Sequence, residues 1–343
     1  MNVIYVFRNA DKLMRLAKLN KFPKLFYGYF AMKQLISTEY ISVGNLNIIR
    51  KFLIKIGFCN NMNNFNSKVL KRLNETDIVY ATNDGLALQL LGLKKDGELK
   101  SLLVINLFAI LDNENYSSKM ELLRYADRII VFTKKLKQAL TELGYDNIFF
   151  IKYGVDTDFY APLKSVLQEN EVSVLGIGLD NKRDWAFFKE VANRFKEISF
   201  KVVTKNSVRK YFNDVRNIHF LGNISFVRTR EEMQRATLLL LPTKENFYFS
   251  GQTTLFNAFS MKKPVIMPYD SYMDDYELDN FLFYNKKNAL NEIEEKINLI
   301  LKKHKRVKES VEFNYNLVKD KYNQMNLAIS IITLLKKIKG LSL

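Results

Sequence analysis

Short apolar runs alternate with helical patterns along this chain, and the alternation limits the fold more than any other feature. In the first half the apolar runs lie at residues 3–7, 78–81, 102–107, 129–132 and 148–152. Helical spacing of apolar residues lies between them, for instance at residues 117–126 and 134–143. Buried strands that alternate with helices are typical of a parallel sheet covered on both faces. The sequence therefore predicts an α/β fold with doubly wound sheets.

The alternation breaks once and then resumes. Residues 163–171 are polar and lack periodicity, so we expect a linker there. Beyond it, strands are predicted at residues 173–178, 200–204, 218–221, 238–241 and 265–267, and helices at residues 185–196, 229–236, 288–305 and 318–339. A chain of 343 residues suits two domains of ordinary size. We predict an N-terminal domain at residues 1–162 and a C-terminal domain at residues 172–317.

The segment at residues 238–268 says most about function. It joins a buried strand, a polar turn with Glu245, a step of small and polar residues, a helix and a second strand. The step consists of Ser250, Gly251, Gln252 and Thr253. Free amides at a helix start, with no bulky side chain in front, form a phosphate site. Because the Glu245 carboxylate accepts from hydroxyl groups, the segment predicts binding of a sugar nucleotide.

Basic residues and a glycine follow other strands of the same domain. Lys182 and Arg183 stand at a helix start, where a cation would stabilise the charge that develops on a diphosphate leaving group. Lys205 follows the next strand and is another candidate phosphate contact. Gly222 would let a base or ribose approach the backbone, although an ordinary turn glycine looks the same. For each basic residue, a solvated surface charge is the competing interpretation.

Four segments resemble, in order and spacing, the retaining glycosyltransferases of family 4. They lie at residues 127–134, 152–162, 217–223 and 238–268. The resemblance implies the GT-B fold, in which two Rossmann-like doubly wound domains face a cleft and a final helix, here about residues 318–343, crosses back to the N-terminal domain. It also implies that the C-terminal domain binds a UDP- or GDP-sugar, that the N-terminal domain binds the acceptor, and that no metal or other cofactor is needed.

Family members usually carry two glutamates eight positions apart in the donor segment. The first matches Glu245, which the resemblance places on the donor sugar. Thr253 stands eight residues later; if the helix is aligned instead, Asn257 takes the second position and is expected near the ribose as a weaker, neutral acceptor. The turn is then four residues longer, and its aromatic residues, such as Phe247, either wall the sugar pocket or pack in the core.

Candidate acceptor-side residues are fewer. Asn83 and Asp84 follow the strand at residues 78–81 and are expected to face the acceptor, although Asn-Asp-Gly is also an ordinary turn. The two histidines, His219 and His304, lie in a predicted strand and a charged helix, so neither is placed as a base. With Cys59 as the lone cysteine, no disulfide and no His–Cys metal site is expected.

Positive charge is concentrated near the N-terminus. Residues 1–72 hold 13 lysines and arginines against Asp11 and Glu39, which is +11 of the total +17. Basic residues there recur at every third position among apolar ones: Lys12, Arg15, Lys18, Lys21 and Lys24. A second basic and apolar cluster lies at residues 48–58. The pattern fits a helix lying on anionic lipid or a solvated face with core residues behind it. It contains no recognised nucleic-acid motif.

The sequence thus predicts a retaining glycosyltransferase that moves a sugar from a nucleoside diphosphate to a glycan or lipid-linked acceptor. The start of the chain looks like a strand rather than a signal peptide, and no apolar run spans a bilayer, so we expect a cytoplasmic protein, peripheral on the inner membrane face if the basic region binds lipid. Two alternatives stay open: a non-catalytic binding protein with the same fold, and another GT-B enzyme such as a sugar-nucleotide epimerase.

Overall fold

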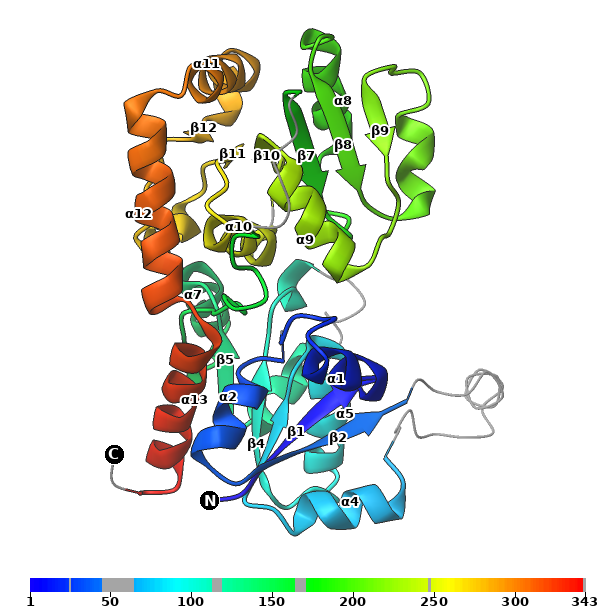
Figure 1. The fold of residues 1–343 in the computed structure, drawn as a ribbon. Helices are drawn as coiled ribbons and strands as arrows, with labels where there is room; N and C mark the ends of the chain where they lie inside the picture. Colours follow the sequence, from blue (N-terminus) through cyan, green and yellow to red (C-terminus); the bar gives the residue numbers. More distant parts are fainter. Residues whose placement is uncertain (25, 45–64, 113–118, 164–170, 246–247, 342–343) are drawn as a thin grey trace. The chain divides into compact units, whose positions relative to one another are not determined.

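The computed structural model describes residues 1–24, 26–44, 65–112, 119–163, 171–245 and 248–341. The chain forms two compact units, which Figure 1 shows as a ribbon. The first unit comprises Met1–Leu19, Lys24–Lys152 and Met325–Leu343. The second comprises Asn20–Pro23 and Tyr153–Gln324. Several predictions lie outside the described residues, namely those for Phe247, Cys59, the second basic cluster at residues 48–58 and most of the linker at residues 163–171.

The first unit is built on a six-stranded parallel sheet in the order β2-β1-β3-β4-β5-β6. Its strands are β1 (Val3–Arg8), β2 (Thr38–Val43), β3 (Ile78–Ala81), β4 (Leu102–Asn106), β5 (Arg128–Val131) and β6 (Ile148–Phe150). The strand order reverses between β1 and β3, because β2 pairs with one edge of β1 and β3 with the other. Such a switch point is where open α/β sheets bind ligands.

Helices complete the first unit. They are α1 (Asp11–Lys18), α2 (Tyr29–Leu35), α4 (Ser67–Asn74), α5 (Asp84–Lys95), α7 (Lys134–Glu142) and α13 (Gln324–Ile338), with the 3-10 helices η1 (Ile110–Asp112) and η2 (Met120–Tyr125). All but the first residue of α13 belong to this unit, although the helix closes the sequence. It packs closely, since a Cβ on Gly28 would lie 3.2 Å from the Ala328 backbone. The final helix therefore returns to the N-terminal unit.

The second unit repeats the architecture with the strand order β12-β11-β10-β7-β8-β9, again all parallel. Its strands are β7 (Ser173–Ile177), β8 (Ser199–Val203), β9 (Ile218–Phe220), β10 (Leu238–Leu240), β11 (Val265–Pro268) and β12 (Phe283–Tyr284). Its helices are α8 (Trp185–Arg194), α9 (Phe226–Arg235), α10 (Gln252–Ser260), α11 (Ala289–Leu301) and α12 (Lys305–Lys321), with η3 (Asn206–Tyr211), η4 (Ser271–Tyr276) and η5 (Lys286–Asn288). The switch point lies between β7 and β10.

The prediction of doubly wound parallel sheets is confirmed.

Some predicted elements differ from the structure. Residues 117–126 were expected to form a helix, but the described part is the short 3-10 helix η2. The helix predicted at residues 288–305 ends at Leu301, because Lys303 takes the left-handed conformation with φ +51°. The helix predicted at residues 318–339 is interrupted, because α12 ends at Lys321 and α13 begins at Gln324. Both interruptions are turns without proline or glycine, which the spacing of apolar residues does not reveal.

In the basic N-terminal region, most of the described apolar side chains are buried or half-buried. Lys12, Arg15 and Lys18 are exposed on α1, as expected. Of the apolar residues interleaved with them, Leu19 is 65% exposed, whereas Phe22 and Phe26 are buried. Phe22 packs on the ring of Phe226 at a centroid distance of 4.5 Å. The exposed face of this region is therefore mainly charged.

Candidate functional site

Two loops meet at the switch point of the second sheet. One follows β7 and the other follows β10. The Asp184 amide donates to the Pro242 carbonyl at 3.0 Å, and the Lys244 amide donates to the Lys182 carbonyl at 2.8 Å. Between these bonds, Arg183 and Thr243 form an antiparallel bridge. The backbone of both loops is thus fixed at the edge of the sheet where ligands of this architecture bind.

Arg183 is the central side chain of this edge. It is only 4% exposed, and its Nε donates to the Ile177 carbonyl at 2.9 Å. Its Nη1 donates to the Ser250 hydroxyl at 3.0 Å and lies 3.2 Å from the Asp180 carboxylate. Burial lowers the pKa of Arg183, and the Asp180 carboxylate opposes that shift. Because a guanidinium stays protonated in proteins, the site holds a fixed, buried positive charge.

Two glycines make room for this guanidinium. A Cβ on Gly178 would lie 2.4 Å from both Cγ and Nε of Arg183, a separation that real Cβ atoms do not show. Gly251 has φ +90°, and a Cβ there would lie 3.4 Å from Arg183 Nη2. Glycine at both positions lets the cation sit against the backbone at the start of α10.

The start of α10 differs from the starts of neighbouring helices. Asp184 caps α8 by accepting from the Phe187 amide at 3.1 Å, and Ser225 caps α9 in the same way. At α10 the residue before the helix is Gly251, which has no side chain to cap the first amides, and the Gln252 amide donates to the Phe249 carbonyl at 3.1 Å. Gln252 and Thr253 form the first positions of the helix. The turn from Ser250 to Thr253, predicted as a phosphate cradle, thus joins a helix N-terminus to the Arg183 guanidinium.

The ends of β8 and β9 adjoin the same edge. Gly222 has φ +73°, which favours glycine, and its carbonyl accepts from the Thr204 amide at 3.2 Å. The Thr204 hydroxyl donates to the Gly178 carbonyl at 2.6 Å, so this region is tied to the loop that carries Arg183. Lys205 follows Thr204 and is exposed. A Cβ at Gly222 would lie 2.9 Å from Asn206 Oδ1, so glycine also avoids a clash within the unit.

Three other predicted donor residues differ from one another in their surroundings. Glu245 is exposed and lines a hollow of about 670 Å³ with residues that follow β11 and β12, among them Tyr269, Asp270 and Lys287. Lys182 is half-buried. Asn257 is 5% exposed on α10, and its Oδ1 accepts no hydrogen bond from any described residue. The structure therefore groups Arg183 with Ser250 and Gly251, and it places Glu245 and Asn257 in separate surroundings.

Sequence reasoning missed two polar neighbours of Arg183. Asp180 pairs with it from three residues upstream, and an acidic residue so close to an arginine in a strand-to-helix turn was a visible signal. Tyr272 comes from η4, and burial together with the Asp270 carboxylate raises its pKa. Its ring packs on Phe249 at a centroid distance of 4.5 Å. No spacing in the sequence points to Tyr272, since it reaches the site only through the fold.

The side chains of the candidate acceptor residues accept hydrogen bonds from backbone amides of the first unit. The Asn83 side chain caps α5 by accepting from the Leu86 amide at 3.1 Å. The Asp84 carboxylate is 8% exposed and accepts from the Phe108 and Ala109 amides, both at 2.9 Å. Burial raises the pKa of Asp84 to about 6, although these two hydrogen bonds oppose the shift. Such contacts favour the structural interpretation of this Asn-Asp-Gly turn over direct contact with an acceptor.

The described residues contain neither a metal-binding cluster nor a helix that could cross a membrane. No group of three His, Cys, Asp or Glu side chains is arranged to hold a metal ion there. Likewise, none of the helices in that part of the chain is long and apolar enough to cross a membrane.

Comparison with known proteins shows the fold. No protein-family model and no curated protein matches the sequence. Among solved structures, HepE from Anabaena in complex with UDP is 13% identical, with a TM-score of 0.70 over 98% of this chain and 100% of that one. A glycosyltransferase from Rickettsia africae is 16% identical, with a TM-score of 0.69 and 99% of each chain covered. Sucrose-phosphate synthase from Thermosynechococcus elongatus is 11% identical, with a TM-score of 0.72 over 99% of this chain and 100% of that one. The chain has the GT-B fold.

Proposed function

We propose that this protein is a glycosyltransferase that takes a sugar from a nucleoside diphosphate donor bound on the second unit. The observation that carries the proposal is the buried Arg183 guanidinium, bonded to Ser250 beside the uncapped start of α10. A fixed cation beside the start of a helix favours a diphosphate, and both stabilise its charge further when the glycosidic bond breaks. Structures of HepE contain UDP and UDP-glucose, which makes a UDP-sugar the first donor to test.

The other donor contacts follow from their places in the unit. Gly222 would lie against the nucleoside, and Lys205 and Lys182 would add charge near the phosphates. Glu245 would accept from hydroxyls of the transferred sugar, because its exposed carboxylate lines the hollow beside the ends of β11 and β12. The buried Oδ1 of Asn257 lacks a hydrogen-bond donor among the described residues, so a ribose hydroxyl would satisfy it. Asp180 would keep Arg183 oriented.

We infer a retaining reaction without a metal ion, on a glycan or lipid-linked acceptor. Arg183 and the α10 amides supply the positive charge that a metal would otherwise bring to the diphosphate. Neither histidine of the sequence stands at the switch point: His219 lies in β9, and His304 caps α12. We therefore propose front-face attack by the acceptor, in which the departing phosphate takes the acceptor proton.

A panel of UDP- and GDP-sugars tests donor binding and turnover together. We expect one sugar nucleotide to raise the melting temperature, because a ligand of the native state stabilises it by mass action. The same compound should be hydrolysed or used as a donor. Glu245→Ala should lower turnover roughly 10- to 100-fold, which corresponds to the loss of a charge-assisted hydrogen bond.

Glu190→Ala is the matched control, because Glu190 is an exposed glutamate of the same unit, on α8. Its turnover should equal that of the unaltered protein. Stabilisation without any turnover would favour a non-catalytic binding protein. If Glu245→Ala turned over normally, Glu245 would not contact the sugar. If no sugar nucleotide changed the melting temperature or was consumed, the proposed function would be wrong.

We also propose that the basic region attaches the protein to an anionic membrane surface. Since Phe22 and Phe26 are buried, attraction would come from the charges of α1 rather than from inserted rings. Each basic residue near such a surface contributes about 1 kcal/mol. Replacing Lys12, Arg15 and Lys18 together by glutamate should therefore release the protein from vesicles that contain phosphatidylglycerol, as measured by flotation at low salt.

The same charge change on α7 is the control, at Lys134, Lys135 and Lys137, which are also exposed on the first unit. That variant should stay bound to the vesicles. If the unaltered protein does not float with anionic vesicles at low salt, or if the α1 variant floats equally well, the membrane proposal fails.

A further inference from the structure

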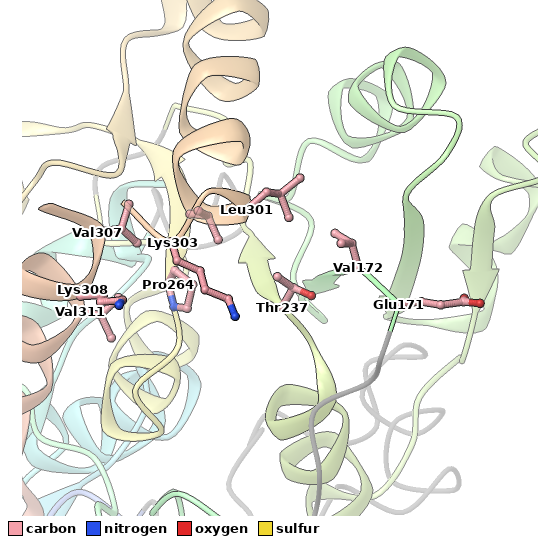
Figure 2. A pocket seen from close by; sticks show the side chains of 10 residues that line it. Glu171, Val172, Thr237, Pro264, Leu301, Lys303, Val307, Lys308 and Val311 are labelled. Carbon is pink, nitrogen blue, oxygen red and sulfur yellow. The ribbon is translucent and has the colours of Figure 1, made fainter. Parts of the chain in front are cut away.

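A second hollow, of about 650 Å³, lies in the second unit (Figure 2). On one side are Val172, Thr237 and Pro264, the residues that immediately precede β7, β10 and β11. On the other side are residues of α11, α12 and the turn between them. The hollow is thus at the amino edge of the sheet, whereas Arg183 and the α10 start are at the carboxyl edge. Its size is within the range of about 300–1,000 Å³ that is usual for small-molecule sites.

The hollow combines apolar walls with two lysines. The apolar residues are Val172, Pro264, Ile300, Leu301, Val307 and Val311. Lys303 and Lys308 are exposed at the same hollow and form no ion pair with any described residue. Their neighbours differ, since Lys305 pairs with Glu309 and Arg306 pairs with Asp279 at 2.6 Å. Figure 2 shows the Lys303 side chain extending toward Thr237, while the Glu171 carboxylate points away. The lining is therefore apolar and cationic.

The backbone at Lys303 is unusual for a lysine. The Lys303 amide donates to the Ile300 carbonyl at 3.0 Å, and the His304 amide donates to the Leu299 carbonyl at 3.0 Å. These two bonds form a Schellman motif, in which the residue with positive φ is usually glycine. Lys303 takes that position with φ +51°, a conformation that strains a residue with a side chain. Glycine would suit the turn better, so the turn itself does not account for lysine at this position.

The start of α12 adds to the positive potential, although the His304 side chain already accepts from the Arg306 amide at 3.2 Å. The helix has 17 residues and begins at Lys305, and its first turns carry Val307, Lys308 and Val311 into the wall of the hollow. The N-terminus of a helix has a partial positive charge that favours anions. Lys303 and Lys308 thus line the same hollow as the apolar residues, and Lys302 stands next to Lys303 in the sequence.

We propose that this hollow binds an amphipathic anion, a ligand with an apolar chain and a terminal phosphate or carboxylate. The chain would lie against Val172, Pro264 and Val307, where it displaces water from apolar surface. The anionic group would receive hydrogen bonds from Lys303 and Lys308, whose ammonium groups form no ion pair with a described carboxylate. The site is independent of the donor edge, so its occupancy does not require a sugar nucleotide.

Calorimetric titration with monomeric dodecyl phosphate tests the site. We expect it to bind at least about tenfold more tightly than inorganic phosphate, which lacks the chain, and than dodecyl maltoside, which lacks the charge. Lys303→Gly should weaken dodecyl phosphate binding roughly tenfold or more, as the loss of a charge-assisted hydrogen bond does. Because glycine relieves the positive φ, this variant should melt at an equal or higher temperature, so misfolding would not explain the lost affinity.

Lys262→Gly is the matched control. Lys262 has φ +55° and also follows a helix with Schellman bonds, from its amide to Phe259 and from the Lys263 amide to Ala258, but it does not line the hollow. It should keep full affinity for dodecyl phosphate. Stabilisation by UDP should be the same in both variants as in the unaltered protein.

Three results would overturn the proposal. Dodecyl maltoside could bind as tightly as dodecyl phosphate, which would show that charge is not recognised. Lys303→Gly could keep its affinity, or lose no more than Lys262→Gly loses. Finally, the protein could bind phosphatidylglycerol vesicles in a manner sensitive to Lys303 and yet ignore monomeric dodecyl phosphate, which would assign these lysines to a lipid surface.

Discussion

Arg183→Ala is expected to lower sugar-nucleotide turnover strongly and to destabilise the second unit. The substitution deletes a buried cation and the hydrogen bonds that it donates to the Ser250 hydroxyl and the Ile177 carbonyl. A hydrogen bond to a charged group contributes about 1.5–3 kcal/mol to the free energy of unfolding, so we expect a loss of roughly 2–4 kcal/mol. Loss of a donor that stabilises transition-state charge lowers turnover by about 10²- to 10³-fold. Urea unfolding and donor consumption measure the two effects.

Two further variants show whether the effect comes from charge or from geometry. Arg183→Lys keeps the charge, but one ammonium cannot reproduce the planar fork that reaches both Ile177 and Ser250. Compared with Arg183→Ala, the Arg183→Lys variant should regain part of the lost stability and little of the lost turnover. Arg216→Ala removes an exposed arginine of the same unit. It should change the free energy of unfolding by no more than about 0.5 kcal/mol and leave turnover unchanged. Normal turnover in Arg183→Ala would contradict the role given to the guanidinium.

Gly178→Ala should reproduce much of the Arg183 defect without touching the arginine. The backbone of Gly178 needs no positive φ, so the effect is steric: the new methyl group would stand 2.4 Å from Arg183 Cγ and Nε. The arginine must leave its position, and overpacking of this kind costs about 1–3 kcal/mol. We expect a comparable loss of donor turnover, because the cation no longer lies against Gly251. Unfolding and kinetic measurements on the purified variant check both effects.

The two substitutions should not be additive. In an Arg183→Ala background the space is empty, so Gly178→Ala should cost little more; a double-mutant cycle measures this coupling. Gly92→Ala is the control, because no atom lies within 4 Å of a Cβ built there and Gly92 is inside α5. It should stabilise the protein by roughly 0.5–1 kcal/mol. Additive losses at Gly178 and Arg183 would show that the clash between the new methyl group and the arginine is not the cause.

Much of the fold was predictable because parallel strands buried on both faces are continuous apolar runs. The strands of the central sheets were recognised in this way. Edge strand β2 (Thr38–Val43) was not, since it mixes polar with apolar residues, and β12 is only two residues long. The break between α11 and α12 was missed because lysine and histidine, at positions 303 and 304, give no turn signal. Local backbone conformation there depends on packing rather than on residue type.

The sequence predicted several residues of the candidate site, but it did not predict which of them contact one another. Sequence position alone placed Arg183 and the turn at Ser250 after two strands, and the order of those strands in the sheet brings them together. The hydrogen bond between them joins residues 67 positions apart, a pairing that no spacing reveals. The Asp84 carboxylate illustrates the reverse case. The sequence suggested that Asp84 contacts an acceptor, whereas its carboxylate accepts hydrogen bonds from backbone amides 24 and 25 positions away.

The long separation between Arg183 and Ser250 also bears on how the site is assembled as the protein folds. Contacts between distant positions form only after the chain between them has been ordered, which includes β8, β9 and β10. A partly folded second unit would therefore lack the anion site even if α10 had already formed. A sugar nucleotide should recognise only the completed unit, and a donor present during refolding should trap native molecules without accelerating the earlier steps. In a cell, the supply of donor would then influence how much of this protein persists as well as how fast it works.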